Sequence, residues 1–227
     1  MKIKFKTLIP EAIHSLKKIK PTYFEWFNKA IEDYKKNKFK ISTAKCPGII
    51  SVLNTGWVQY TYQDIRITTF GNKTDFKWET PINQKQTKYG EFINDYVSYH
   101  IPEQFAKYKN IPKNTLNTLI KIQSPWVVYI PKGYQLLVMP VAYNDVDIFS
   151  TSVGFLKNFN FLNVQLQWKK INGSFTIKKG TPLAQYILVK DNSILEKITT
   201  VNDLDIKNVK KHIDHSAEKY GKEALNI

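Results

Sequence analysis

The chain has 227 residues, and its 34 Lys and Arg side chains outnumber its 19 Asp and Glu side chains by 15. Hydrophobic residues make up 42% and aromatic residues 14%, a composition that excludes an intrinsically disordered protein. The apolar runs fall well short of the roughly 20 residues of a membrane span. The N-terminus lacks the apolar core of a secretory signal, and the single cysteine excludes an intrachain disulfide.

The net positive charge has two interpretations. It indicates a polyanionic partner such as a nucleic acid, or it reflects the amino-acid usage of an AT-rich genome together with solubility. Arg66 is the only arginine, although arginine is the preferred residue for bidentate contacts to phosphate and guanine. Lys, Asn and Ile are abundant together, so the sequence favours the genomic interpretation.

The first elements alternate between strand and helix patterns. Residues 2–9 alternate Lys with apolar residues and predict a strand that ends at Pro10. Residues 11–20 predict a short helical turn, because three apolar residues recur there at a spacing of three: Ile13, Leu16 and Ile19. Residues 21–37 predict an amphipathic helix with lysines near its end and one apolar face: Phe24, Phe27, Ile31 and Tyr34.

Residues 46–80 predict a run of strands separated by turns. The turn signals are Pro47-Gly48, Asn54-Thr55-Gly56 and Gly71-Asn72. The last of them is expected to close a hairpin onto residues 75–80. Residues 81–120 are less regular and are punctuated by proline and glycine.

Residues 121–190 carry the densest β pattern. Short segments rich in β-branched and aromatic residues are separated by Gly and Pro turns, which is typical of a β-sandwich or barrel. The five expected strands are 126–130, 134–143, 159–168, 174–177 and 183–189. We therefore predict a mainly β domain, a distorted sandwich, over residues 1–200 with a helical element at 21–37, and a C-terminal helical tail over 201–227.

Few residues offer catalytic chemistry. Cys46 precedes a turn, but a lone cysteine usually packs as a small apolar residue. His212 and His215 share one face of the predicted tail helix, yet a metal site needs further ligands from a distant segment. The motifs of a nucleophile elbow, a phosphate-binding loop and a dinucleotide fold are absent from the sequence.

Asp145 and Asp147 are the best candidates for a cation site. Residues two apart on a strand point to the same face, so these two carboxylates could hold Mg²⁺ together. The same residues also fit a solvent-exposed turn that begins at Asn144. Asp64 and Arg66 have the same spacing and could form a surface ion pair.

Aromatic residues alternate with lysines in three segments, YIPKGY, FLKNFNF and QWKK. Rings and lysines together can bind single-stranded nucleic acid by base stacking and charge. Alternating aromatic residues in strands are more often part of a sandwich core, and the sequence favours the core.

Two segments resemble the β-clip proteins of the dUTPase and dCTP deaminase superfamily. The first is YIPKGYQLLVMP, with a turn at Pro131 and Gly133, and the second is FTIKKGTPLAQYIL, with Gly180, Ala184 and Gln185. The resemblance covers residues 124–190. It implies a β-clip fold that assembles as a homotrimer, and it places Gln185 near a nucleotide. Tyr134, in the strand after the first turn, is a further candidate ligand residue.

The sequence departs from this family at the positions that carry its chemistry. The family's hydrolases use a central Asp to activate water, but the corresponding residues 150–161 contain no carboxylate. Its phosphate-binding segment contains Ser and Arg, and neither occurs in residues 139–145. Pro182 stands where an Arg often stands. The resemblance therefore implies a scaffold without the standard catalytic residues.

The layout of the chain also resembles uncharacterised proteins of tailed marine bacteriophages. Their shared elements are Cys46-Pro47-Gly48, Gly56-Trp57, Ser124-Pro125-Trp126 and Pro131-Lys132-Gly133-Tyr134. This resemblance implies a viral protein of the host cytoplasm or the virion, neither secreted nor membrane-spanning. We expect a non-catalytic binding or virion-assembly protein without a cofactor, whose partners are other viral proteins or further copies of itself.

Two alternatives stay open. The first is a nucleotide phosphohydrolase with atypical site residues, which would use Asp145, Asp147 and Gln185 with Mg²⁺. The second is a protein that binds single-stranded nucleic acid, which the sequence does not favour.

Overall fold

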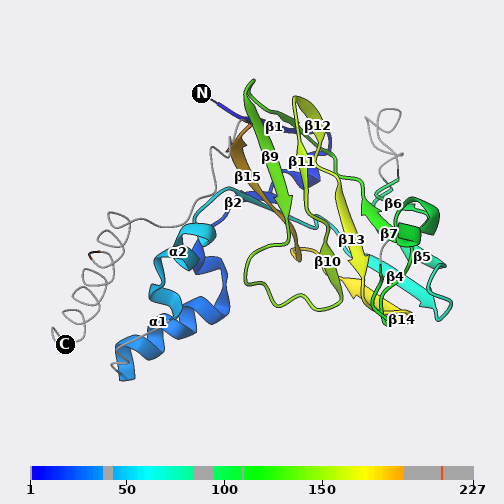
Figure 1. Ribbon diagram of the computed structural model, residues 1–227, viewed down its shortest axis with the longest axis horizontal. Coiled ribbons are helices and arrows are strands. Elements are labelled where there is room, and N and C mark those ends of the chain that lie inside the picture. The colour runs from blue at the N-terminus through cyan, green and yellow to red at the C-terminus, as the bar shows by residue number, and fades with distance from the viewer. Residues whose placement is uncertain (1, 38–42, 84–94, 109, 192–210, 212–227) are drawn as a thin grey trace. The chain divides into compact units, whose positions relative to one another are not determined.

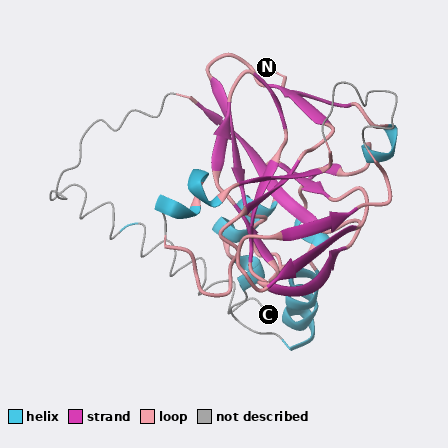
Figure 2. Ribbon diagram, turned by 90° about the vertical axis from the view of Figure 1, so that its right-hand side faces the viewer, coloured by secondary structure: helices cyan, strands magenta, loops and turns pink. Residues whose placement is uncertain are grey.

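The computed structural model describes residues 2–37, 43–83, 95–108, 110–191 and 211 of the chain (Figure 1). The contacts within the chain divide it into two compact units. One unit consists of Met1–Ile19 and Asn54–Asp191, and the other consists of Lys20–Leu53 and Asn192–Ile227. Within the described residues the regular structure is mostly strand, as the magenta arrows in Figure 2 show. The predicted mainly β class is therefore confirmed.

Four antiparallel sheets make up the first unit. The two smaller ones have the orders β1-β8-β12 (Lys4–Thr7, Trp126–Tyr129, Phe159–Phe161) and β14-β4-β5 (Asn172–Ile177, Ile65–Phe70, Phe76–Glu79). The third has the order β10-β13-β7-β6 (Phe149–Thr151, Val164–Trp168, Leu119–Ile122, Val97–His100). The fourth has the order β11-β9-β15-β3-β2 (Gly154–Leu156, Tyr134–Met139, Pro182–Lys190, Trp57–Tyr60, Leu16–Lys18).

Alternation along the strands directs one face of each sheet inward. In β13, Val164, Leu166 and Trp168 are buried, whereas Gln165 between them is exposed. Because successive side chains of a strand point to opposite faces, this pattern buries one side of the strand and leaves the other in solvent. The rule that predicted the strands from the sequence therefore also explains which residues form the core.

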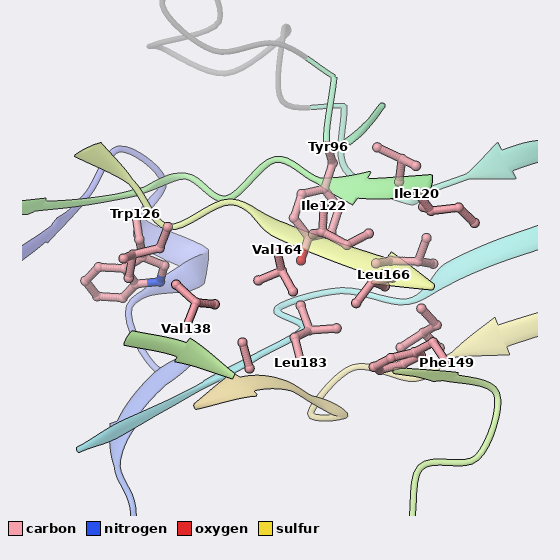
Figure 3. Close-up of a cluster of buried hydrophobic side chains, with 14 of the residues drawn as sticks. Tyr96, Ile120, Ile122, Trp126, Val138, Phe149, Val164, Leu166 and Leu183 are labelled. Atoms are coloured by element: carbon pink, nitrogen blue, oxygen red, sulfur yellow. The ribbon is translucent and has the colours of Figure 1, made fainter. Parts of the chain in front are cut away.

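The sheets share a single hydrophobic core (Figure 3). Side chains from distant parts of the chain meet there, among them Ile120, Val138, Phe149, Val164 and Leu183. Their strands belong to two different sheets, so the packing of sheet on sheet holds the unit together.

Several sequence predictions are confirmed. β1 lies within the predicted strand at residues 2–9, and β4 and β5 form the predicted hairpin around Gly71. The five segments predicted between residues 121 and 190 all contain strands. The segment at 159–168, however, holds two strands, β12 and β13, in different sheets. The break falls at Leu162, which is fully buried and donates its backbone N–H to Trp126 O at 3.0 Å.

The prediction of strands directly after Cys46 is wrong. The residues that follow form helix α2, Pro47–Leu53, and Ile50 N donates to Cys46 O at 3.0 Å. Proline is well suited to the first helical position, because it has no N–H and its fixed φ matches the helix. Pro47 therefore starts a helix here, although it was interpreted as part of a turn.

The prediction of a helical turn at 11–20 is also wrong in its main part. A 3-10 helix spans Pro10–Ala12, and the chain then enters strand β2, Leu16–Lys18, at the edge of a sheet. Pairing with β3 satisfies the backbone of β2, so the spacing of the apolar residues does not decide the structure. Ile13, which the helical pattern would bury, is 52% exposed.

The second unit contains the two described α-helices. Helix α1 spans Glu25–Asn37, after a 3-10 helix at Pro21–Tyr23, so the helix expected from residue 21 starts four residues later. Phe27 on its predicted apolar face is buried. The predicted tail helix, with His212 and His215, and the predicted boundary at residue 201 lie outside the described residues. Among the described helices, none has the length and apolar composition needed to cross a membrane.

Candidate functional site

Gln185, the residue expected near a ligand, has its amide bound to the main chain. The side chain lies on β15 and is fully buried. Its Oε1 accepts a hydrogen bond from Ala142 N at 3.1 Å, and its Nε2 donates to Thr55 O at 3.0 Å. The amide thus joins the segment after β9 to the segment before β3, which is a structural role.

Asp145 and Asp147 lie on the surface between β9 and β10. Both residues are exposed, and the Asp147 carboxylate is 3.4 Å from Lys170 Nζ. Val146 between them points inward and packs against the core. Across the part of the chain that the structure describes, no group of three or more His, Cys, Asp or Glu residues could hold a metal ion. The two residues lie in the loop that follows Asn144 rather than on a strand, and they gain no further ligand among the described residues.

Tyr134 and Gln185 lie at opposite ends of one strand pair. Tyr134 is opposite Lys190 in the register of β9 and β15, whereas Gln185 is opposite Met139. The separation of five positions along the strand corresponds to about 17 Å. Tyr134 is half-buried and packs against the core. The fold therefore does not bring these two candidates into one site.

Asp64 and Arg66 do not pair with each other. Arg66 Nη1 lies 3.7 Å from Glu79 Oε2 on the neighbouring strand β5. Asp64 accepts hydrogen bonds from Lys179 N at 2.7 Å and from Lys178 Nζ at 3.1 Å. Both bonds lower the pKa of the Asp64 carboxyl, and the bond from the Lys179 backbone N–H contributes most. Arg66 therefore pairs with the neighbouring strand, and Asp64 binds the turn after β14, in place of the pair predicted from the sequence.

The three-stranded sheet β1-β8-β12 has one face in the core, and its other face is exposed along one row of residues. Lys4, Tyr129 and Phe159 lie directly opposite one another in the register of its three strands, so their side chains share a face. Two residues along each strand, Lys6 and Phe161 lie on either side of Val127. At this end of the face Lys6 is exposed, whereas Val127 is buried and Phe161 is half-buried and packs against the core. Val128, on the other face, is fully buried.

The solvent face of this sheet combines aromatic rings with positive charge. We call it the aromatic–lysine face, and it comprises Lys2, Lys4, Lys6, Tyr129, Phe159 and Phe161. Tyr129 is 44% and Phe159 is 53% exposed, although both carry large apolar rings. Their ring centroids are 5.0 Å apart, and the rings of Phe159 and Phe161 are 6.4 Å apart.

The lysines border the rings. Lys6 Nζ lies 5.6 Å from the centroid of the Tyr129 ring, which is within the range of a cation–π contact. A shallow groove of about 310 Å³ runs along the face and is lined by Lys2, Lys4, Lys6, Tyr129, Ile130 and Pro131. Among the residues that the structure describes, its lining contains three lysines and no carboxylate, which gives the groove a positive potential at neutral pH.

The sequence pointed to part of this face. The segments YIPKGY and FLKNFNF contribute Tyr129, Phe159 and Phe161, whereas Trp168 of the segment QWKK is fully buried in the core. The contribution of Lys2, Lys4 and Lys6 was missed, because their alternation was interpreted only as a strand pattern. The long-range pairing of β1 with β8 is what places them beside the rings.

Comparison with known proteins gives no sequence relative. No family model matches the chain, and no curated protein matches it. Among solved structures, the chain is similar to a dUTPase mutant from phage phi11 of S. aureus, with a TM-score of 0.41 and 9% identity over 90% of this chain and 99% of that one. It is also similar to a dUTPase mutant from Staphylococcus bacteriophage 80alpha, with a TM-score of 0.40 and 10% identity over 89% of this chain and 99% of that one. Similarity at this level carries no conclusion about function.

Proposed function

We propose that the protein is a non-catalytic binding protein and that the aromatic–lysine face is its binding surface. The observation that carries the proposal is the exposure of Tyr129 and Phe159 beside three lysines on one sheet face. Exposing large rings costs free energy of solvation, and exposed aromatic residues bordered by charge are typical of recognition surfaces. The positive groove selects an anionic partner.

The candidate nucleotide site supports the non-catalytic part of the proposal. A general base must reach the proton that it removes. Residues 150–161 contain no carboxylate, and the Gln185 amide is bound to main-chain atoms. The exposed carboxylates Asp145 and Asp147 are the residues on which the phosphohydrolase alternative depends.

Anion binding is tested on a heparin column with charge-matched variants. We expect the double variant Lys4→Glu/Lys6→Glu to elute at lower salt than the wild type. The control Lys77→Glu/Lys113→Glu changes the net charge equally at exposed positions away from the face. If both variants elute together, net charge alone explains the retention and the proposed surface is wrong.

The non-catalytic part has its own assay. The purified chain is incubated with a panel of deoxynucleoside triphosphates and Mg²⁺, and we expect no release of phosphate or pyrophosphate above the buffer. Turnover that Asp145→Asn abolishes would replace the proposal with the phosphohydrolase alternative. The partners expected from the sequence, other viral proteins or further copies in a homotrimer, stay predictions.

A further inference from the structure

We infer that the ligand of the aromatic–lysine face is single-stranded nucleic acid, held by base stacking on Tyr129 and Phe159 and by phosphate contacts of Lys2, Lys4 and Lys6. This inference rests on the proposed function, because it names the partner of the same surface. The geometry of the rings, the spacing of the lysines and the shape of the groove each support it.

The rings are available to flat ligands. Tyr129 and Phe159 lie on adjacent strands with their centroids 5.0 Å apart and an angle of 52° between the ring planes. Each ring is about half exposed. An unpaired base has two free π-faces and can stack on such a ring whatever its sequence. In a duplex both faces of each base are covered by neighbouring bases, so the same rings have nothing to stack on.

The lysines are arranged in a row beside the rings. Lys4 and Lys6 are two residues apart on β1, which corresponds to about 6.8 Å along the strand. Lys2 continues the alternation and lines the same groove. A row of ammonium groups at this spacing can contact successive phosphates of an extended strand whose bases lie over Tyr129 and Phe159.

The lack of arginine fits this mode of binding. Arginine is needed where a protein reads guanine or clamps one phosphate with two hydrogen bonds. Binding by stacking and point charges needs neither, and it yields little sequence preference. The single arginine, Arg66, lies on β4 in another sheet. The scarcity of arginine therefore counts against sequence-specific binding of nucleic acid, and not against binding by stacking and charge.

The groove also argues against an acidic protein segment as the ligand. A peptide that adds to a sheet edge uses main-chain hydrogen bonds, whereas the groove lies over side chains on the face of the sheet. Glutamate and aspartate side chains would match the lysines, but they leave the two rings without a flat partner. We therefore assign the face to nucleic acid and include an acidic polypeptide in the test.

Fluorescence anisotropy with a short labelled oligothymidylate measures the interaction directly. We expect the wild-type chain to bind it, and to bind the same sequence more weakly as a duplex. Three phosphate contacts on a single strand predict that log K falls with log salt at a slope of about −2. The double variant Lys4→Ala/Lys6→Ala is expected to reduce that slope by about 1.4.

Ring variants separate stacking from charge. Phe159→Ala is expected to weaken binding about 5- to 150-fold, the range seen when a stacking ring is removed. Phe159→Leu keeps an apolar side chain without the ring, and we expect it to weaken binding similarly. The matched control is Phe70→Ala, because Phe70 is 49% exposed and has Lys77 Nζ 5.8 Å from its ring centroid, but lies on β4. Phe70→Ala is expected to leave the affinity unchanged.

Each outcome decides between the proposals. No binding at low salt, equal binding of the duplex, or equal losses in Phe159→Ala and Phe70→Ala would overturn the nucleic-acid inference. Competition by polyglutamate as effective as competition by unlabelled oligothymidylate would assign the face to an acidic protein instead. If heparin retention still depends on Lys4 and Lys6 in those cases, the binding surface stands and only its ligand is wrong.

Discussion

Gly56 shows how a single residue controls the approach of two strands. Its φ is +87°, in the left-handed region that favours glycine, and a Cβ at this position would lie 1.9 Å from Tyr186 O. The backbone before β3 therefore passes β15 so closely that only a hydrogen atom fits. The sequence marked this glycine as a turn residue, but the close contact with β15 becomes visible only in the fold.

We expect Gly56→Ala to destabilise the protein by about 2–5 kcal/mol, from backbone strain and from the displacement of β15. Gly180→Ala is the control, because Gly180 has the same φ of +87° but no atom within 4 Å of the added Cβ. Its expected cost is the strain alone, about 1–2 kcal/mol. Urea unfolding compares the two variants, and equal costs would show that the contact with Tyr186 is unimportant.

The sequence is compatible with two roles for Gln185, a ligand contact and a contact with the backbone. Its position in the late strand suggested a ligand contact, and the sequence left open whether its amide meets a ligand or the backbone. The residues that it binds, Ala142 and Thr55, lie 43 and 130 positions away in the chain. No sequence pattern within the strand specifies partners at such separations.

Among the elements, the turn that follows β14 is hydrogen-bonded to Asp64, the residue just before β4. Its carboxylate accepts from Lys179 N and Lys178 Nζ, and both bonds favour the ionised form. The pKa of Asp64 is therefore lower in the folded chain than its ordinary value. A carboxyl group with a lowered folded pKa stabilises the fold above its unfolded pKa, and this contribution disappears as the pH falls through the folded pKa.

We therefore expect the wild-type protein to lose stability as the pH falls below about 4, and Asp64→Asn to show a flatter profile in that range. Asparagine can still accept a hydrogen bond from Lys179 N, but it does not titrate. The measurement is the urea midpoint as a function of pH, with the exposed Asp145→Asn as the control. An unchanged acid profile in Asp64→Asn would mean that other carboxylates dominate.

Helix α2 and strand β2 show where local patterns fail. Both segments are short, and their apolar residues fit more than one periodicity. In such segments the neighbouring element decides: β3 offers β2 a hydrogen-bonding edge, and Pro47 starts a helix where a turn was expected. Strands with longer alternating patterns, such as β4 and β13, were predicted correctly, because alternation places every second side chain in the core.

At the scale of the whole molecule, the N-terminal strand completes a sheet formed much later in the chain. β1 pairs with β8, whose residues are 119 to 125 positions away, and Ile3, Phe5 and Leu8 pack against the core. Half of the residues of β1 are lysines, so the composition of this strand resembles that of a solvated tail. Its apolar residues nevertheless belong to the core, and its lysines form the binding face.

We expect a chain that lacks residues 1–7 to be destabilised by about 3–6 kcal/mol, since the two partly buried side chains Ile3 and Phe5 and the β1–β8 hydrogen bonds are lost. That is a large share of the 5–15 kcal/mol of a typical domain. Thermal unfolding followed by near-ultraviolet circular dichroism measures the change. The control Lys4→Ala/Lys6→Ala removes the charges but keeps the strand, and should melt close to the wild type. Equal melting of the truncated and full chains would show that β1 is dispensable.

The sequence patterns predicted the mainly β class, most strands of residues 121–190 and the hairpin around Gly71. These features follow from alternation and turn chemistry, which act between neighbours in the chain. The packing of the sheets, by contrast, sets which of the aromatic residues are buried and which lysines lie beside the exposed ones. Strand pairing across more than 100 residues depends on how whole sheets pack, and a local pattern carries no information about it.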